Sequence, residues 1–313
     1  MKSLMCFLAA GMLLVSPAVL EAKISRTVEK NFSVQPGGRL KATTQGGDIV
    51  IRTADIQEVR ISARQTIRAS SEEEADRVLA DLTLTLEQVG NEVNVEAKYE
   101  KRNVKSWFGV RTPVTVGFTI TVPQNFNLDL RTSGGDISAE SLRGNVKAHT
   151  SGGDMRFQRI DGEIDGSTSG GDIFLQEGTA RAKLHTSGGN VVVERAGGPT
   201  EVSTSGGDIT LHSVEELIRA HTSGGDVNAV LTGMLAKDAV LSTSGGDVRV
   251  RVPKSAAFNL DARTSGGDVD AKGLTITIEG GGIGKRSLVG SVNGGGARLK
   301  LRTSGGDIRI RTE

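Results

Sequence analysis

A five-residue turn sequence, Thr-Ser-Gly-Gly-Asp, recurs from Thr132 to the C-terminus and limits the possible folds more than any other feature. Copies begin at Thr132, Thr150, Thr168, Thr186 (with Asn190 replacing Asp), Thr204, Thr222, Thr243, Thr264 and Thr303, and a degenerate copy begins at Thr44. Five steps between consecutive copies from Thr132 on are 18 residues long, two are 21 and the last is 39. Such a period is typical of stacked repeats, and we expect the long last step to contain one rung that lost its motif.

Apolar and polar residues alternate between the turns, as in Leu128-Asp129-Leu130-Arg131 and Val248-Arg249-Val250. This alternation predicts strands with one buried face. One repeat cannot bury its apolar face alone, so we expect repeats to stack about 4.8 Å apart. The predicted fold is all-β: a parallel β-solenoid (β-helix) of 18-residue rungs with two or three sides.

The same alternation places each repeat Thr inward, where its hydroxyl could bond from rung to rung, and the residue before it outward. We expect the glycines to adopt positive φ angles in the turn. The residues predicted to form the turn are Gly134, Gly135, Asp136, Gly152, Gly153, Asp154, Gly170, Gly171, Asp172, Gly206, Gly207 and Asp208.

The turn carboxylates form a column that must offset its own repulsion. The column comprises Asp136, Asp154, Asp172, Asp208, Asp226 and Asp247, interrupted by Asn190. Each Asp can accept hydrogen bonds from turn N–H groups or a neighbouring Ser hydroxyl, which is the interpretation we favour. Calcium between rungs is the alternative, although the second glycine and nine-residue period of calcium-binding repeats are missing. We expect no cofactor and no metal site.

The N-terminal part has a different pattern. We expect a signal peptide at 1–22, strands and a capping insertion at 23–131, and the repeat solenoid at 132–313. Ser71 to Glu74 predicts a helix start, Gly90-Asn91 a hairpin, and Val114 to Val122 a strand, so residues 54–122 are expected to cap the solenoid. At the other end, Arg309, Arg311 and Glu313 are expected to keep the last strand from pairing with another chain.

The first residues resemble a secretory signal: Lys2, an apolar run, then small residues up to Ala22. Cleavage is expected after Ala22, or alternatively after Ala18. The only cysteine, Cys6, lies in this segment, and no later apolar run is long enough to span a membrane. We therefore expect an exported protein, periplasmic or extracellular in the cell envelope.

Composition narrows the possible partners. The 38 basic and 37 acidic residues are nearly balanced, which argues against a nucleic-acid partner. The most informative segment outside the repeat, Lys98 to Arg111, contains the candidate contact residues Tyr99, Trp107, Phe108 and Arg111. Aromatic residues among cations suit contact with a partner, glycan or membrane surface. We favour a simpler role for Trp107, covering the open end of the solenoid core.

No residue pattern predicts catalysis. His149, His185 and His221 occupy alternate rungs, about 9.6 Å apart, too far for a shared metal. His212 lies at another phase, and all four are interpreted as surface residues. The glycine-rich segment around Lys285 lacks phosphate-loop spacing. Paired carboxylates of a carbohydrate-active β-helix enzyme remain the catalytic alternative, but nothing singles out a pair.

The repeated turns, the helix-containing N-terminal insertion and the closing Val292-Asn293-Gly294 to Ile308 segment resemble the bacterial putative-adhesin family of unknown function. The resemblance covers essentially the whole mature chain. It implies a β-solenoid and an envelope location, but no substrate, cofactor or catalytic residue. We therefore expect a non-catalytic, adhesin-like binding or structural scaffold whose partner is an envelope protein or surface glycan. The alternatives are the carbohydrate-active enzyme and a calcium-binding repeat protein.

Overall fold

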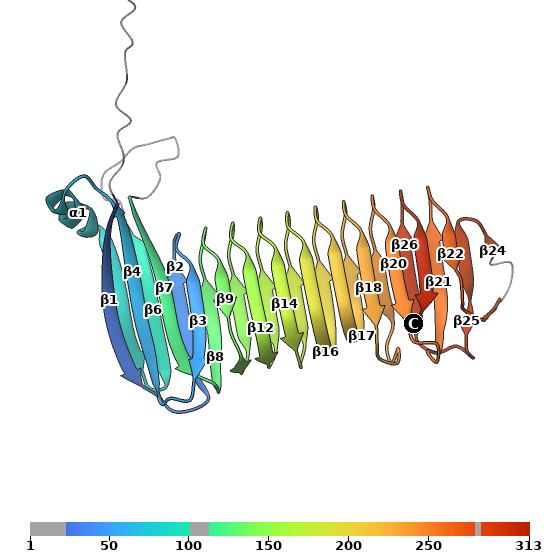
Figure 1. Ribbon diagram of the computed structural model, residues 1–313, viewed down its shortest axis with the longest axis horizontal. Coiled ribbons are helices and arrows are strands. Elements are labelled where there is room, and N and C mark those ends of the chain that lie inside the picture. The colour runs from blue at the N-terminus through green and yellow to red at the C-terminus, as the bar shows by residue number, and fades with distance from the viewer. Residues whose placement is uncertain (1–22, 101–112, 279–282) are drawn as a thin grey trace, which may run out of the picture.

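The computed structural model is a long β-solenoid whose strands run across the axis of the stack (Figure 1). It describes residues 23–100, 113–278 and 283–313. Each rung has one strand that leads into the Gly-Gly turn and one that leaves it. We call the stacks of these strands the pre-turn layer and the post-turn layer. The predicted parallel β-solenoid is confirmed.

The pre-turn layer takes one strand from each rung. In stacking order it contains β5 (Leu82–Val89), β6 (Glu92–Tyr99), β2 (Gly38–Thr44), β8 (Phe126–Arg131), β11 (Val146–His149), β13 (Ile164–Ser167), β15 (Ala182–His185), the second parts of β16 (Val191–Ser203) and β17 (Ile209–His221), β19 (Ala239–Ser242), β26 (Arg298–Thr303), β21 (Phe258–Thr264) and β25 (Ser287–Val292). The short strands β23 (Ile276–Thr277) and β24 (Ile283–Gly284) pair with β25.

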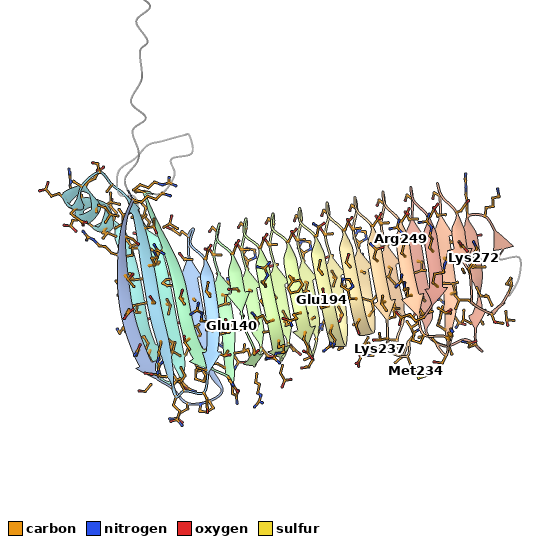
Figure 2. The ribbon with its side chains drawn as sticks, in the orientation of Figure 1. Glu140, Glu194, Met234, Lys237, Arg249 and Lys272 are labelled. Carbon is orange, nitrogen blue, oxygen red and sulfur yellow. The ribbon has the colours of Figure 1, made fainter. Side chains whose placement is uncertain are left out.

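The post-turn layer is the other long side of the coil. Its strands, in stacking order, are β1 (Lys23–Ser33), β4 (Glu58–Arg68), β7 (Val114–Pro123), β3 (Ile49–Ala54), β9 (Ile137–Ala139), β12 (Met155–Asp161), β14 (Ile173–Gly178), the first parts of β16 and β17, β18 (Val227–Leu231), β20 (Val248–Val252), β27 (Ile308–Thr312) and β22 (Val269–Ala271). Figure 2 labels Glu194 and Arg249 on this layer.

A short third side completes the coil. Pairing between β12 and β14 breaks after Phe157 and resumes at Arg159, because two consecutive outward residues, Gln158 and Arg159, bend the strand. Beyond this bend β12 pairs with β10 (Leu142–Arg143). Loops at this edge, opposite the Gly-Gly turns, carry Met234 and Lys237 (Figure 2).

The core consists of columns of equivalent side chains, one from each rung. The residue after the turn Asp or Asn shows this most simply, because it is at most 1% exposed in these eight rungs: Ile137, Met155, Ile173, Val191, Ile209, Val227, Val248 and Ile308. In the rung of Thr264, near the end of the stack, the equivalent Val269 is partly buried. The parallel register puts these side chains directly above one another. Every rung thus buries the apolar face of its neighbours, as a stacked-repeat architecture requires.

The N-terminal insertion extends the stack beyond the first rung. Ser71 caps the helix α1 (Glu72–Leu79), accepting a hydrogen bond from the Glu74 N–H at 3.2 Å, and β5 and β6 form the expected antiparallel hairpin. β6 and β7 pair in parallel with β2 and β3 and so extend the stack before the first rung. The outermost strands cover each other's free backbone groups, since Lys30 Nζ donates to the Leu86 carbonyl and Gln88 Nε2 to the Ser33 carbonyl.

The C-terminal end corrects two of our predictions. The 39-residue step hides no lost rung, because the last rung, β26 and β27, inserts between the rungs of Thr243 and Thr264. The C-terminus therefore lies inside the stack (Figure 1). β27 is consequently not an edge strand, and Arg309 does not guard an edge. Its guanidinium bridges Asp247 and Asp307 on adjacent rungs, at 3.1 and 2.7 Å.

Within the three described stretches of the chain, no helix has the length and apolarity needed to cross a bilayer. The expected signal peptide, residues 1–22, lies outside them.

Candidate binding face

The predicted turn residues stack in one column along the solenoid, which we call the turn column. Hydrogen bonds between neighbouring rungs in this column explain the repeated sequence. Each repeat Thr is buried, and its hydroxyl bonds to the neighbouring rung as expected, although the acceptor is a glycine carbonyl. Thr150 Oγ1 donates to the Gly135 carbonyl at 2.9 Å and accepts from the Gly153 N–H at 3.3 Å. The same pair of bonds recurs at Thr168, Thr186, Thr204 and Thr222.

The expected positive φ angles are wrong for these turns, since no repeat glycine is among the residues with positive φ. Glycine is needed at the second position for a different reason, the close approach of the neighbouring rung. A Cβ on Gly153 would lie 2.0 Å from the Gly135 carbonyl oxygen. On Gly152, by contrast, the nearest atom would be 3.8 Å away.

The Asp column is a ladder of side-chain to backbone hydrogen bonds, in agreement with the turn-forming interpretation. Asp136 Oδ1 accepts from the Asp154 N–H at 2.8 Å, and Asp154 Oδ1 accepts from the Asp172 N–H at 2.8 Å. Asn190 keeps the ladder intact, because its Oδ1 accepts from the Asp208 N–H at 2.8 Å. The described ranges contain no group of three or more His, Cys, Asp or Glu arranged to hold a metal ion.

Arginines add cations to this column near the C-terminal end. Arg249 bridges Asp226 and Asp247, with both nitrogen–oxygen distances 2.6 Å. Burial alone would raise the pKa of Asp226, but the Asp247 N–H and the Arg249 guanidinium outweigh it and hold this pKa below its ordinary value. The column is therefore bonded to cations in its last rungs, whereas Asp136 to Asp208 rely on backbone N–H groups.

Of the four candidate contact residues, only Tyr99 lies among the described residues. Tyr99 ends β6, is half-buried against the core, and has its N–H bonded to Gln45 Oε1 at 2.9 Å. Burial raises the pKa of its phenol. Tyr99 is thus part of the solenoid packing, while Trp107, Phe108 and Arg111 lie outside the described residues.

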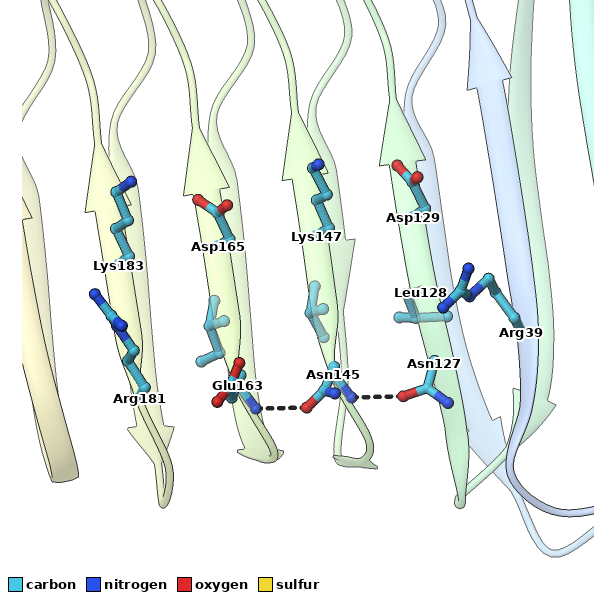
Figure 3. Close-up of a pocket in the computed structure, with 12 residues that line it drawn as sticks. Arg39, Asn127, Leu128, Asp129, Asn145, Lys147, Glu163, Asp165, Arg181 and Lys183 are labelled. Atoms are coloured by element: carbon cyan, nitrogen blue, oxygen red, sulfur yellow. Dashed lines mark hydrogen bonds between the residues drawn. The ribbon is translucent and has the colours of Figure 1, made fainter.

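The outward face of the pre-turn layer is the candidate binding face. A shallow depression of about 570 Å³ crosses β2, β8, β11, β13 and β15 (Figure 3). A second, of about 610 Å³, adjoins it over β5 and β6 and shares Arg39 and Asp129 with the first. Figure 3 shows the side chains standing in rows that run across the strands.

One row alternates in charge from strand to strand. In register, Lys147 lies between Asp129 and Asp165, and Asp165 between Lys147 and Lys183. Opposite charges in adjacent strands attract each other weakly. The described residues nevertheless include no ion-pair partner within 4.0 Å of Lys147 or Lys183, so both ammonium groups face solvent.

The adjacent row contains the three outward histidines in the positions expected. Each histidine Nδ1 lies 2.9 Å from the hydroxyl of a serine on the next rung: His149 with Ser167, His185 with Ser203, and His221 with Ser242. These contacts orient the rings, so that Nε2 is the nitrogen left for an external partner. His212 lies on the post-turn layer, with its Nε2 3.8 Å from Glu194 Oε1.

The sequence reasoning missed this face, although its signal was present. Lys147, Lys183 and Arg219 are 36 residues apart, as are His149, His185 and His221. The turn motif drew attention to the 18-residue period, while the outward residues follow a double period.

Among the similar solved structures are proteins described as putative adhesins. One, from Bacteroides fragilis, is 14% identical, with 92% of this chain and 97% of that one covered and a TM-score of 0.43. Another, from Parabacteroides merdae, is 11% identical, with 92% and 96% covered and a TM-score of 0.45. A protein from Parabacteroides distasonis described as a putative lipid binding protein is 13% identical, with 92% and 96% covered and a TM-score of 0.40. No curated protein matches the chain.

The family comparison covers most of the molecule. The model of the Toastrack family, DUF4097, matches residues 39–311, from the first rung to the last strand. This span includes the turn column, the capping insertion and the pre-turn face. The chain belongs to the Toastrack DUF4097 family.

Proposed function

We propose that this protein is a non-catalytic, adhesin-like binding scaffold of the cell envelope, and that the pre-turn face is its binding surface. The observation that carries this proposal is the pair of adjoining depressions across β5 to β15. The solenoid holds the same side-chain types in register over many strands, on a rigid backbone. Such a surface suits a long ligand or an extended partner surface better than a single small molecule.

The regular strands support this proposal through their rigidity. A side chain on a strand paired on both sides has a fixed position, so little ordering of the backbone is needed on binding. Free charges are also present on this face, since Lys147 and Lys183 are exposed and not paired within 4.0 Å among described groups. Both properties favour the recognition of a polar or charged partner.

The proposed location is the envelope, with residues 1–22 acting as a cleaved signal peptide, 23–131 as the capping region and 132–313 as the scaffold. Envelope polysaccharides and envelope proteins are then the partners within reach. N-terminal sequencing of the exported protein checks the leader: a mature chain beginning at Lys23 is expected, and a retained Met1 would contradict it.

Binding of the full chain to isolated bacterial envelopes tests the proposed face. The double variant Lys147→Gln/Lys183→Gln removes two charges from the pre-turn face. Its matched control, Arg156→Gln/Arg251→Gln, removes two exposed charges from the post-turn layer. We expect the first pair to weaken binding by about tenfold, since each exposed ionic contact contributes up to about 1 kcal/mol, and the second to leave binding unchanged. Equal binding by wild type and both variants would contradict the proposal.

A further inference from the structure

The pre-turn face carries a chemical repeat twice as long as the structural one. Inward residues and turn residues recur every rung, but from β11 to β17 the residues in two of the outward rows alternate between two kinds of rung. β11, β15 and β17 each present a cation and a histidine: Lys147 with His149, Lys183 with His185, and Arg219 with His221. The rungs between them present an acid and a serine: Asp165 with Ser167, and Glu201 with Ser203.

The spacing of this double repeat follows from strand geometry. Adjacent strands lie about 4.8 Å apart, so equivalent cations recur about every 9.6 Å along the solenoid axis. Each cation and its histidine stand two residues apart on one strand and therefore point from the same face. The result is a line of cationic positions at a fixed interval, with an acid midway between each pair.

Stability of the solenoid does not account for the whole pattern. Alternating charge avoids like charges on adjacent strands, which explains a basic residue next to an acidic one. It does not require the histidines to occupy the same rungs as the cations. In addition, the serine contacts at 2.9 Å use only Nδ1 of each histidine, and Nε2 takes no part in them.

The chemistry of this line selects one class of ligand. The ligand must be linear, because the cations lie in one row across adjacent strands. It needs an anionic group about every 9.6 Å and none midway, where Asp165 would repel it. The other midway acid, Glu201, is paired with Arg181 at 2.7 Å. The disaccharide of an extended, unbranched glycan has about this length. The residues lining the depression include no aromatic ring, so contacts would be ionic and hydrogen-bonded rather than stacked.

We propose that the pre-turn face binds an unbranched acidic polysaccharide with one carboxylate per disaccharide, laid along the solenoid axis. Successive carboxylates meet Lys147, Lys183 and Arg219, and the intervening neutral sugar passes over Asp165 and Glu201. This inference rests on the proposed binding role of the face and names its ligand class. Asp165 acts as a selectivity element, because it disfavours a polymer charged at every sugar.

Calorimetric titration of the full chain with three oligosaccharides of equal length tests the proposal. Hyaluronate carries a carboxylate on alternate sugars, oligogalacturonate on every sugar, and chito-oligosaccharide on none. We expect hyaluronate to bind at least about tenfold more tightly than either of the others. Lys147→Gln/Lys183→Gln should weaken hyaluronate binding by about tenfold, and the control Arg156→Gln/Arg251→Gln should not change it.

A second variant isolates the role of Asp165. Asp165→Asn keeps the side-chain shape and removes the repulsion without disturbing the Arg181–Glu201 ion pair, so it should tighten oligogalacturonate binding and narrow its gap to hyaluronate. Equal affinity for all three oligosaccharides, binding of none, or an unchanged gap in this variant would overturn the inference. If none binds but the lysine variant still loses envelope binding, the ligand class is wrong and the proposed face stands. If the lysine variant also binds envelopes as well as the wild type does, both the ligand class and the proposed binding face are wrong.

Discussion

Replacing the second glycine of a turn by alanine should destabilise the solenoid, whereas replacing the first should not. In the turn that starts at Thr150, a Cβ on Gly153 would lie 2.0 Å from the Gly135 oxygen and 2.3 Å from its carbon. Real Cβ atoms essentially never approach closer than 3.0 Å, so the two rungs would have to separate by about 1 Å. The contact is with backbone, which cannot rotate away as a flexible side chain could.

The size of the effect follows from the hydrogen bonds that this separation stretches. Thr150 Oγ1 to the Gly135 oxygen is 2.9 Å, and the Asp154 nitrogen to Asp136 Oδ1 is 2.8 Å. An added displacement of about 1 Å takes both beyond hydrogen-bond range. The Thr150 bond is buried, and losing the partner of a buried polar group costs about 1–3 kcal/mol, whereas the Asp154 bond is exposed and contributes about 0.5–1.5 kcal/mol. We therefore expect Gly153→Ala to cost about 2–4 kcal/mol.

The neighbouring glycine is the matched control. A Cβ on Gly152 meets nothing closer than 3.8 Å, and its φ is not positive. Gly152→Ala should therefore change stability by less than about 0.5 kcal/mol, or stabilise slightly by restricting the unfolded chain. Urea unfolding followed by circular dichroism compares the two variants. Equal midpoints would refute the argument that close approach between rungs, rather than backbone conformation, requires the glycine.

Three further predictions concern the turn column and its cations. Thr204→Val should cost about 1–3 kcal/mol of stability, because it leaves the Gly189 carbonyl and the Gly207 N–H without the hydroxyl that they share. Thr204→Ser should retain most of the stability, and equal urea midpoints for the two variants would contradict this. Asp154→Ala should speed hydrogen exchange at the Asp172 N–H, because that N–H loses its side-chain acceptor. Asp154→Asn should keep the exchange slow, since Asn190 Oδ1 accepts from the Asp208 N–H in the same way. Equal exchange rates in the two variants would show that the side-chain acceptor is unimportant. Burial would raise the pKa of Asp261, but the Arg302 and Arg263 guanidinium groups outweigh it and hold this pKa below its ordinary value, so the stabilisation is present above the ordinary pKa and lost as pH falls through the folded-state pKa. The urea-midpoint gap between wild type and Asp261→Asn should therefore shrink on acidification below the ordinary Asp pKa, and a gap that is constant with pH would rule out this linkage.

The double variant of the pre-turn face and the turn variants report on separate properties. Lys147 and Lys183 are exposed and take no part in the turn column, so their replacement should leave the urea midpoint almost unchanged. The atoms nearest to a Cβ on Gly153 belong to the neighbouring turn and not to the charged row, so Gly153→Ala should change stability and not the charges of the binding face. A variant that changes ligand binding but not the urea midpoint therefore acts through the pre-turn face. A variant that changes the urea midpoint but not ligand binding acts through the turn column.

Sequence alone determined the rung, its inward threonines and its outward histidines. Each depends on the two-residue alternation within one strand, which is a local property. The helix start at Ser71 and the hairpin at Gly90 were predictable for the same reason, since capping and turn residues act within a few positions. The double period of Lys147 and Lys183 was equally visible, and it was missed because the turn motif repeats more often.

Only the tertiary structure decided how the rungs meet. The reason for glycine at position 153 is a distance to the next rung, and no residue within its own turn reveals it. The direction of the Asp154 hydrogen bond and the bridging by Arg249 likewise depend on contacts between rungs. The insertion of β26 and β27 between earlier rungs is the strongest case, because identical turn motifs make every rung a possible neighbour of every other. A repeat specifies what each rung is, but the order of stacking is settled by the packing and hydrogen bonds between rungs distant in sequence.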